Sequence, residues 1–155
     1  MKLDEAQLKL NLVQDYVPAG NSNRPGRKLI ATSITIHNTD NSSPGANAAA
    51  HAKYMKGADA RKREVSWHFS VDDQFVYQSL PTTEIGWHTA TAAGNNSSIG
   101  IEICMNPELD VPAAYDRAAL PNGWSDFLSA AKSYLDEMEP VDAVVIRPPK
   151  DDHLS

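Results

Sequence analysis

Two histidines and one glutamate occupy positions where the sequence would normally carry apolar or loop residues. His37 ends the β-branched run of residues 29–37, and Glu102 lies between two isoleucines in the apolar run of residues 99–105. His88 follows a Gly-Trp pair and precedes a glycine-containing loop. Imidazole and carboxylate groups can move protons, and imidazole also binds metal ions. Because a carboxylate on an apolar strand is costly unless it is paired, hydrogen-bonded or protonated, Glu102 requires a partner or a functional reason.

Alternation along the strands leaves two interpretations open for these side chains. Successive strand residues point to opposite faces, so Glu102 points away from the face used by Ile101 and Ile103. That second face is either solvent, which makes Glu102 a surface acid, or a functional cleft. His37 is likewise either a strand-end histidine hydrogen-bonded to a loop or part of a site.

The elements that must position these residues alternate between strand and helix. Strands are predicted, from β-branched and alternating apolar residues, over residues 29–37, 66–71, 75–80, 99–105 and 143–146. The second and third form a hairpin around the turn Asp72-Asp73-Gln74. Helices are predicted over residues 1–12, 46–56, 112–120 and 125–138, a charged linker over 58–64 and a flexible loop over 92–97. This order predicts an α/β fold with a mixed central β-sheet flanked by helices.

Length and composition restrict the class of protein. The 155 residues suffice for one domain with an apolar core, so a single domain over residues 1–155 is expected. The net charge of −6 argues against nucleic acid as a partner. Apolar runs fall short of the about 18 residues of a membrane span, which argues against membrane insertion. The N-terminus lacks the apolar stretch of a secretory signal peptide. One cysteine excludes an intramolecular disulfide and a cysteine-rich zinc cluster.

Four strings of residues, taken in order, resemble the type-2 N-acetylmuramoyl-L-alanine amidases. They are ITIHNT at residues 34–39, SWHFSVDD at 66–73, GWH at 86–88 and SIGIEIC at 98–104. Each string alone is a weak signal, but four in series are specific. The likeness is greatest to the catalytic domain of endolysins and autolysins from Bacillus and its phages, and it covers residues 13–119.

The resemblance implies a fold, a reaction and roles for these residues. The fold is peptidoglycan-recognition-protein-like, a mixed sheet with helices on both sides and a shallow cleft over one face. The reaction is zinc-dependent hydrolysis of the amide between N-acetylmuramic acid and the first L-alanine of peptidoglycan. The resemblance makes His37 the first Zn²⁺ ligand and Glu102 the catalytic acid and base. It makes His88 a cleft-wall residue that contacts substrate or helps to stabilise an oxyanion.

From about residue 120 the chain departs from the family pattern. The family completes its zinc site with a second histidine after a short strand, and then with a lysine-containing loop that ends in a Cys or Asp ligand. Here Arg147 stands near the place of the second histidine, and this part of the chain has no cysteine. Lys150 is the candidate catalytic lysine, and Asp152 and His153 are the candidate metal ligands. Residues 120–155 are either a replaced or truncated end or a divergent end that still folds over the sheet.

Two functions follow from these alternatives. A complete zinc site predicts a peptidoglycan amidase, and an incomplete one predicts an inactive peptidoglycan-binding module of the same fold. A metal-dependent nuclease is disfavoured by the acidic charge and by the lack of an Asp/Glu-rich cluster. The expected partner is peptidoglycan, and the expected state is a monomer. The expected place of action is the cell wall or the extracellular space, reached by phage- or prophage-type release because no signal peptide is visible.

Four further residues receive mainly structural interpretations. We expect His68 to be hydrogen-bonded near the site and Cys104 to be a small core residue. His51, on the alanine-rich predicted helix, is expected to be exposed or packed. Trp87 is expected either to line a glycan groove or to be buried.

Overall fold

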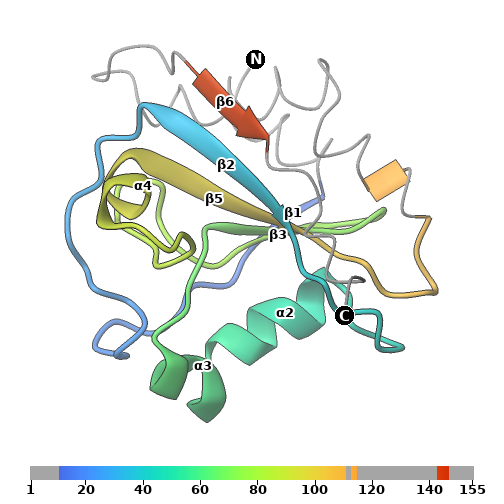
Figure 1. The fold of residues 1–155 in the computed structure, drawn as a ribbon. Helices are drawn as coiled ribbons and strands as arrows, with labels where there is room; N and C mark the ends of the chain where they lie inside the picture. The colour runs from blue at the N-terminus through green and yellow to red at the C-terminus, as the bar shows by residue number, and fades with distance from the viewer. Residues whose placement is uncertain (1–10, 111–112, 115–142, 147–155) are drawn as a thin grey trace, which may run out of the picture.

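Six strands form one mixed sheet in the part of the chain that the structure describes (Figure 1). The structure is a computed structural model that describes residues 11–110, 113–114 and 143–146. The strands are β1 (Leu12–Gln14), β2 (Ser33–Asn38), β3 (Phe69–Val71), β4 (Val76–Gln78), β5 (Ser98–Ile103) and β6 (Ala143–Ile146). Their spatial order is β1-β4-β3-β5-β2-β6. The pairs are parallel except β3 with β4, which is the predicted antiparallel hairpin. The predicted mixed central sheet is confirmed.

Isoleucines that alternate along β2 and β5 hold the centre of the sheet together. Ile34 lies beside Ile99 and Ile36 beside Ile101 in a parallel register, and all four are buried. Register partners on neighbouring strands point to the same face, so these side chains form one apolar surface. The alternate residues of both strands therefore point to the opposite face, where helix α2 lies.

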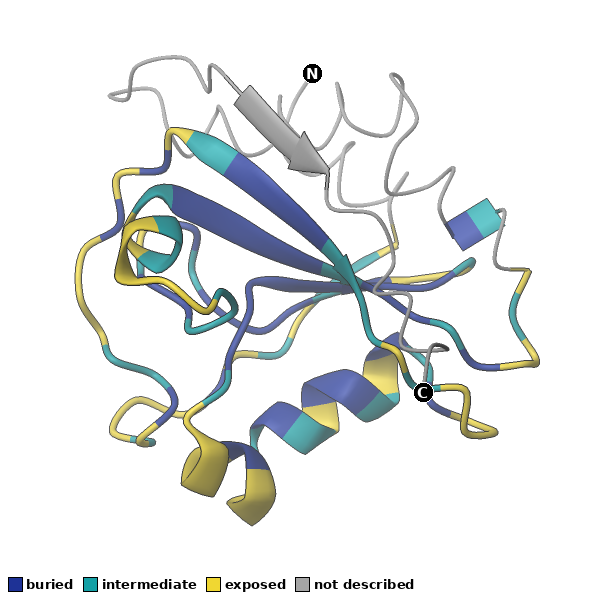
Figure 2. Ribbon diagram, in the orientation of Figure 1, coloured by how far each residue is buried: buried dark blue, intermediate teal, exposed yellow. Residues whose placement is uncertain are grey.

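Helix α2 (Ala48–Met55) packs against β3 and β4 (Figure 1). It starts later than predicted because Asn47 caps it: the Asn47 Oδ1 accepts the backbone N–H of Ala50 at 3.0 Å. Its buried residues have the i, i+3, i+4, i+7 spacing of a face turned toward the sheet, as Figure 2 shows, and they are Ala48, His51, Ala52 and Met55. The helix therefore places a histidine on its inner side.

Two segments predicted to be irregular are short helices instead. The predicted linker over residues 58–64 contains α3 (Ala58–Arg63), and the predicted loop over 92–97 is α4 (Ala92–Ser97). The α3 helix buries Ala60, a tertiary contact that its charged composition does not indicate. The hydroxyl of Thr91 accepts the N–H of Gly94 and caps α4. Since α2, the longest described helix, has eight residues, no described helix is long and apolar enough to cross a membrane.

Fewer predictions can be tested at the two ends of the chain, because most residues there lie outside the described part of the structure. The predicted strand over residues 143–146 is confirmed as β6, which pairs with β2. The predicted helices over 112–120 and 125–138 lie almost entirely outside the described residues. The helix predicted over 1–12 also lies outside them, except for Asn11, which lies in a turn, and Leu12, which begins β1; at these two residues the helix prediction is wrong.

Two apolar clusters lie within the described residues. The larger contains the isoleucines of β2 and β5 with Phe69 and Val71 of β3. The smaller lies under α2 and consists of Val17, Met55, Trp67 and Leu80. Figure 2 shows the buried central strands and the buried side of α2 in dark blue. The face of β2 and β5 that is turned away from the larger cluster remains available to polar side chains.

Asp72 connects the β3–β4 turn to α2. Its carboxylate is buried, and its Oδ1 accepts the backbone N–H groups of Gln74 (2.8 Å) and Phe75 (2.6 Å). Its Oδ2 accepts the N–H of Ala48, at the first turn of α2, at 3.0 Å. One side chain therefore closes the hairpin turn and satisfies a helix-end donor. This confirms the predicted turn role of Asp72.

Replacing Asp72 by alanine should lower the free energy of unfolding by about 3 kcal/mol, because three backbone N–H groups lose a charged acceptor. Urea denaturation at pH 7 measures this loss. Asp73→Ala is the matched control in the same turn, since Asp73 Oδ2 accepts a longer bond of 3.4 Å from Asp110 N. We expect the control to lose less than about 1 kcal/mol. Equal losses in the two variants would contradict the role given to Asp72.

Candidate active site

His37 and Glu102 lie side by side on neighbouring parallel strands. They are register partners in β2 and β5, and strands in a sheet are about 4.8 Å apart. Both side chains point away from the isoleucine surface, and both are half-buried. The fold therefore brings together an imidazole and a carboxylate that are far apart in the sequence.

A hollow of about 420 Å³ lies on this polar face of the sheet, beside α2. The residues that line it include Glu102, Thr39, His51, Tyr54, Arg63 and Trp67. The Oε2 atom of Glu102 is shielded from solvent, so the interpretation of Glu102 as a simple surface acid is wrong. The face that alternation left unassigned is a cleft with a carboxylate in its wall.

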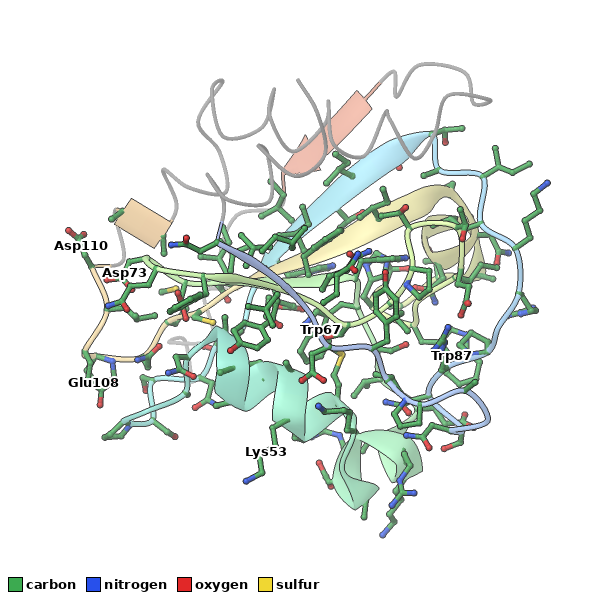
Figure 3. The ribbon with its side chains drawn as sticks, turned by 180° about the vertical axis from the view of Figure 1, so that it is seen from behind. Lys53, Trp67, Asp73, Trp87, Glu108 and Asp110 are labelled. Carbon is green, nitrogen blue, oxygen red and sulfur yellow. The ribbon has the colours of Figure 1, made fainter. Side chains whose placement is uncertain are left out.

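The contribution of α2 to this hollow was not predicted from the sequence. His51 and Tyr54 both pack on Trp67, with ring centroids 6.4 Å apart in each pair and Tyr54 stacked on the indole. Figure 3 shows Trp67 next to α2. His51 is 7% exposed, so it is packed rather than exposed, and burial lowers the pKa of its imidazole. The i, i+3 spacing of His51 and Tyr54 on an alanine-rich helix is the signal that could have identified them.

His68 is held by two hydrogen bonds inside the protein. Its Nε2 donates to the carbonyl oxygen of Glu84 at 2.8 Å, and its Nδ1 accepts the N–H of Gly100 at 2.9 Å. Burial lowers the pKa of His68 to about 4, so the ring is neutral at pH 7. This side chain ties β5 to the loop that precedes His88, which confirms the predicted structural role.

Acidification should destabilise the protein through His68. The folded-state pKa of about 4 lies below the ordinary value of 6.5, so between these pH values only the unfolded chain binds the proton. The stabilisation is fully present above about pH 6.5 and is lost as the pH falls toward 4, by up to about 3 kcal/mol. Urea denaturation between pH 7 and pH 4 measures this for wild type and for His68→Gln. Glutamine can replace both hydrogen bonds but does not titrate, so its curve should be flatter; parallel curves would refute the assignment.

His88 lies between His37 and His68. Its Nδ1 is 3.4 Å from His37 Nε2, and its Nε2 is 3.2 Å from the carbonyl oxygen of Ser98. The ring centroid of His88 is 5.6 Å from that of His37 and 5.9 Å from that of His68, and both contacts are edge-on. Both ring nitrogens of His88 therefore have contacts inside the protein. Its predicted contact with substrate stays a prediction.

Cys104 and Trp87 belong to the packing rather than to the hollow. Cys104 is fully buried, and burial raises the pKa of its thiol, so it is the core residue that was predicted. Trp87 is half-buried and packs against the larger apolar cluster, which favours the core interpretation over the glycan groove.

The structure describes one of the three predicted metal ligands, His37. The other two, Asp152 and His153, and the candidate catalytic Lys150 lie outside the described residues and stay predictions. Within residues 11–110, 113–114 and 143–146, no three His, Cys, Asp or Glu side chains gather closely enough to hold a metal ion. A half-buried imidazole at the end of a strand, beside a carboxylate, fits one nitrogen ligand of zinc. Further ligands would have to come from outside this part of the chain.

The fold and the site together define a class of protein. A strand-borne histidine lies beside a glutamate that lines a hollow on one face of a mixed sheet with flanking helices, and His37 itself is not among the residues that line the hollow. Residues 26–129 match the family model for N-acetylmuramoyl-L-alanine amidase, and the chain belongs to this family. The solved catalytic domain of XlyA has a TM-score of 0.71 and 39% identity over 90% of this chain and 83% of that one. The predicted family and fold are confirmed.

Two similar relatives are amidases of Bacillus subtilis strain 168. N-acetylmuramoyl-L-alanine amidase XlyA is 49% identical over 107 residues, which are 68% of this chain and 35% of that protein. N-acetylmuramoyl-L-alanine amidase CwlH is 43% identical over 112 residues, 70% of this chain and 44% of that protein. The chain therefore spans less than half the length of either relative that it matches.

Proposed function

We propose that the protein hydrolyses the amide between N-acetylmuramic acid and the first L-alanine of the peptidoglycan stem peptide. The observation that carries this proposal is the pairing of His37 with Glu102 on the face of the sheet that holds the hollow. The names of two relatives describe this activity, which supports it. The proposed partner is peptidoglycan, and the proposed setting is a monomer at the cell wall after phage- or prophage-type release.

Glu102 is the proposed general base and general acid. A carboxylate in a partly enclosed hollow can accept a proton from the attacking water and return it to the departing alanine nitrogen. The C–N bond of the amide breaks, and the products are a lactyl carboxylate and a free amine. The position of Glu102 in the wall of the hollow gives the carboxylate access to such a substrate.

The walls of the hollow offer surfaces for both parts of the substrate. The stacked rings of Tyr54 and Trp67 present apolar area that suits a sugar ring or peptide methyl groups. Asn38 and Thr39, at the end of β2, add polar groups near Glu102. We propose that these residues orient the scissile amide toward the carboxylate.

Zn²⁺ is the proposed cofactor, with His37 as one ligand and Asp152 and His153 as candidates for the others. Bound zinc supplies a water molecule of lowered pKa and polarises the scissile carbonyl. In this proposal His37 is a nitrogen ligand on a strand, and its register partner Glu102 is the acid and base. Lys150 is proposed as an additional cation near the reacting carbonyl.

An inactive peptidoglycan-binding module is the second candidate function. It is favoured by the described residues, which do not bring three metal ligands together, and by Arg147 near the place of the family's second histidine. Hydrolytic zinc sites use three protein ligands, so His37 without partners would not hold the metal tightly.

Zinc content and wall lysis separate the two functions. The purified full chain is assayed for bound metal, for dye release from labelled cell walls and for co-sedimentation with unlabelled walls. One zinc per chain together with dye release supports the amidase. Metal-free protein that co-sediments with walls without releasing dye supports the binding module, and the absence of both lysis and binding contradicts both functions.

A further inference from the structure

We propose that His88 is a positioning residue that holds His37 in the tautomer protonated on Nε2. The unprotonated Nδ1 of His37 then becomes the nitrogen that offers its lone pair to a metal ion. This inference rests on the proposed function for its purpose, since that function makes His37 a ligand. The hydrogen-bond geometry that supports it is a property of the protein alone.

The carbonyl oxygen of Ser98 is one end of a chain of hydrogen bonds that runs through His88 to His37. A carbonyl oxygen only accepts, so the 3.2 Å contact between His88 Nε2 and Ser98 O places a hydrogen on that nitrogen. A neutral imidazole carries one hydrogen, so Nδ1 of His88 is then an acceptor. The nitrogen at 3.4 Å from it, His37 Nε2, must be the donor. The same rule then leaves Nδ1 of His37 without a hydrogen.

The ring of His88 is held in place by its neighbours. A Cβ atom at Gly100 would lie 2.5 Å from Cγ of His88, so the imidazole occupies the space that the missing side chain leaves. The backbone N–H groups of His88 and Thr89 both donate to Oδ1 of Asn95 in α4, at 3.0 and 2.8 Å. The ring therefore lies against the backbone of β5, and both hydrogen bonds connect its loop to Oδ1 of Asn95.

His68 completes a row of three imidazoles across this face of the sheet. His68 makes an edge-on contact with the ring of His88, and His37 makes a second edge-on contact with the same ring. Because His68 is itself fixed by Glu84 O and Gly100 N, the row has little freedom to rotate. Partners of this kind, which hold the second nitrogen of a metal-binding histidine, fix its tautomer and orientation.

The first test measures the tautomers directly in the metal-free full chain. Long-range proton–nitrogen correlation spectra at pH 7.5 distinguish a protonated from an unprotonated ring nitrogen. We expect His37 to carry its hydrogen on Nε2, and the assignment is made by comparison with His37→Ala. A spectrum with the hydrogen on Nδ1 of His37 overturns the proposal.

The second test measures zinc affinity by competition with a chelator. His88→Phe keeps a ring over Gly100 but removes both nitrogens, and it should weaken the dissociation constant about 10- to 100-fold. His88→Gln can accept from His37 and donate to Ser98 O, so it should stay within about threefold of wild type. Lys53→Gln, a change at an exposed position of α2 that does not line the hollow, is the control and should bind zinc as wild type does.

The outcomes separate this inference from the proposed function. Zinc binding by His88→Phe that equals wild type overturns the positioning role, as does a loss in Lys53→Gln as large as that in His88→Phe. If the wild-type chain binds no zinc, the proposed metal function fails, while the spectra still decide the tautomer of His37. A misfolded His88→Phe leaves the wild-type spectrum and His88→Gln as the deciding measurements.

Discussion

Replacing Glu102 by glutamine should reduce the rate of peptidoglycan hydrolysis by about 10²- to 10⁴-fold, the usual contribution of a general acid and base. Glutamine has nearly the shape of glutamate but cannot accept or return a proton at neutral pH. The fold and the zinc content should therefore be unchanged. Dye release from labelled cell walls, measured at equal protein concentrations, gives the rate.

Glu64→Gln is the matched control for this experiment. Glu64 follows α3, is exposed and does not line the hollow, so the same chemical change there should leave the rate within about twofold. An active Glu102→Gln variant would remove Glu102 from the mechanism. Equal losses in both variants would show that the assay responds to surface charge rather than to the hollow.

Replacing His37 by alanine should abolish zinc binding and reduce the rate of hydrolysis at least about a thousandfold. Zinc stabilises the charge of the transition state by several kcal/mol, and the rate falls about tenfold for each ~1.4 kcal/mol that is lost. Metal analysis of the purified variant and dye release from walls measure the two effects. We expect the metal-free variant to melt near the temperature of the metal-free wild type, since His37 is half-buried and at the end of its strand.

Thermal melting with added zinc provides an independent readout of the same variant. A ligand at 100 times its dissociation constant stabilises a protein by about 2.7 kcal/mol, which is roughly 5 to 10 °C for a chain of this size. Wild type should show this shift and His37→Ala should not. An undiminished shift in the variant would mean that zinc binds elsewhere.

The strand pairing that builds the site was largely predictable from local alternation. Residues 34–37 and 99–103 alternate strictly, so the opposite orientation of Ile36 and His37, and of Ile101 and Glu102, follows from the pleat alone. The hairpin of β3 and β4 was also predictable from local sequence. The register that places His37 beside Glu102 was not predictable, because it depends on parallel pairing between segments that are far apart in the sequence.

The hollow and the place of His88 depend on tertiary packing that no local pattern contains. The sequence predicts that Trp67 is a strand residue. Its contacts with His51 and Tyr54 form only because α2 packs against the sheet. His88 reaches His37 because Gly100, on another strand, leaves room for its ring. The α3 helix was missed because its charged sequence indicates a linker, whereas the burial of Ala60 stabilises it.

The chemistry of the cleavage products tests the central claim most directly. Purified cell walls are digested with the full chain, and the products are analysed by mass spectrometry and by labelling of new amino groups. The pairing of His37 and Glu102 as amidase groups predicts free amino termini on L-alanine, an equal number of muramic acid residues with a free lactyl carboxylate, and no new reducing sugar ends. Walls left intact, or cut at a sugar linkage or at another peptide bond, would contradict it.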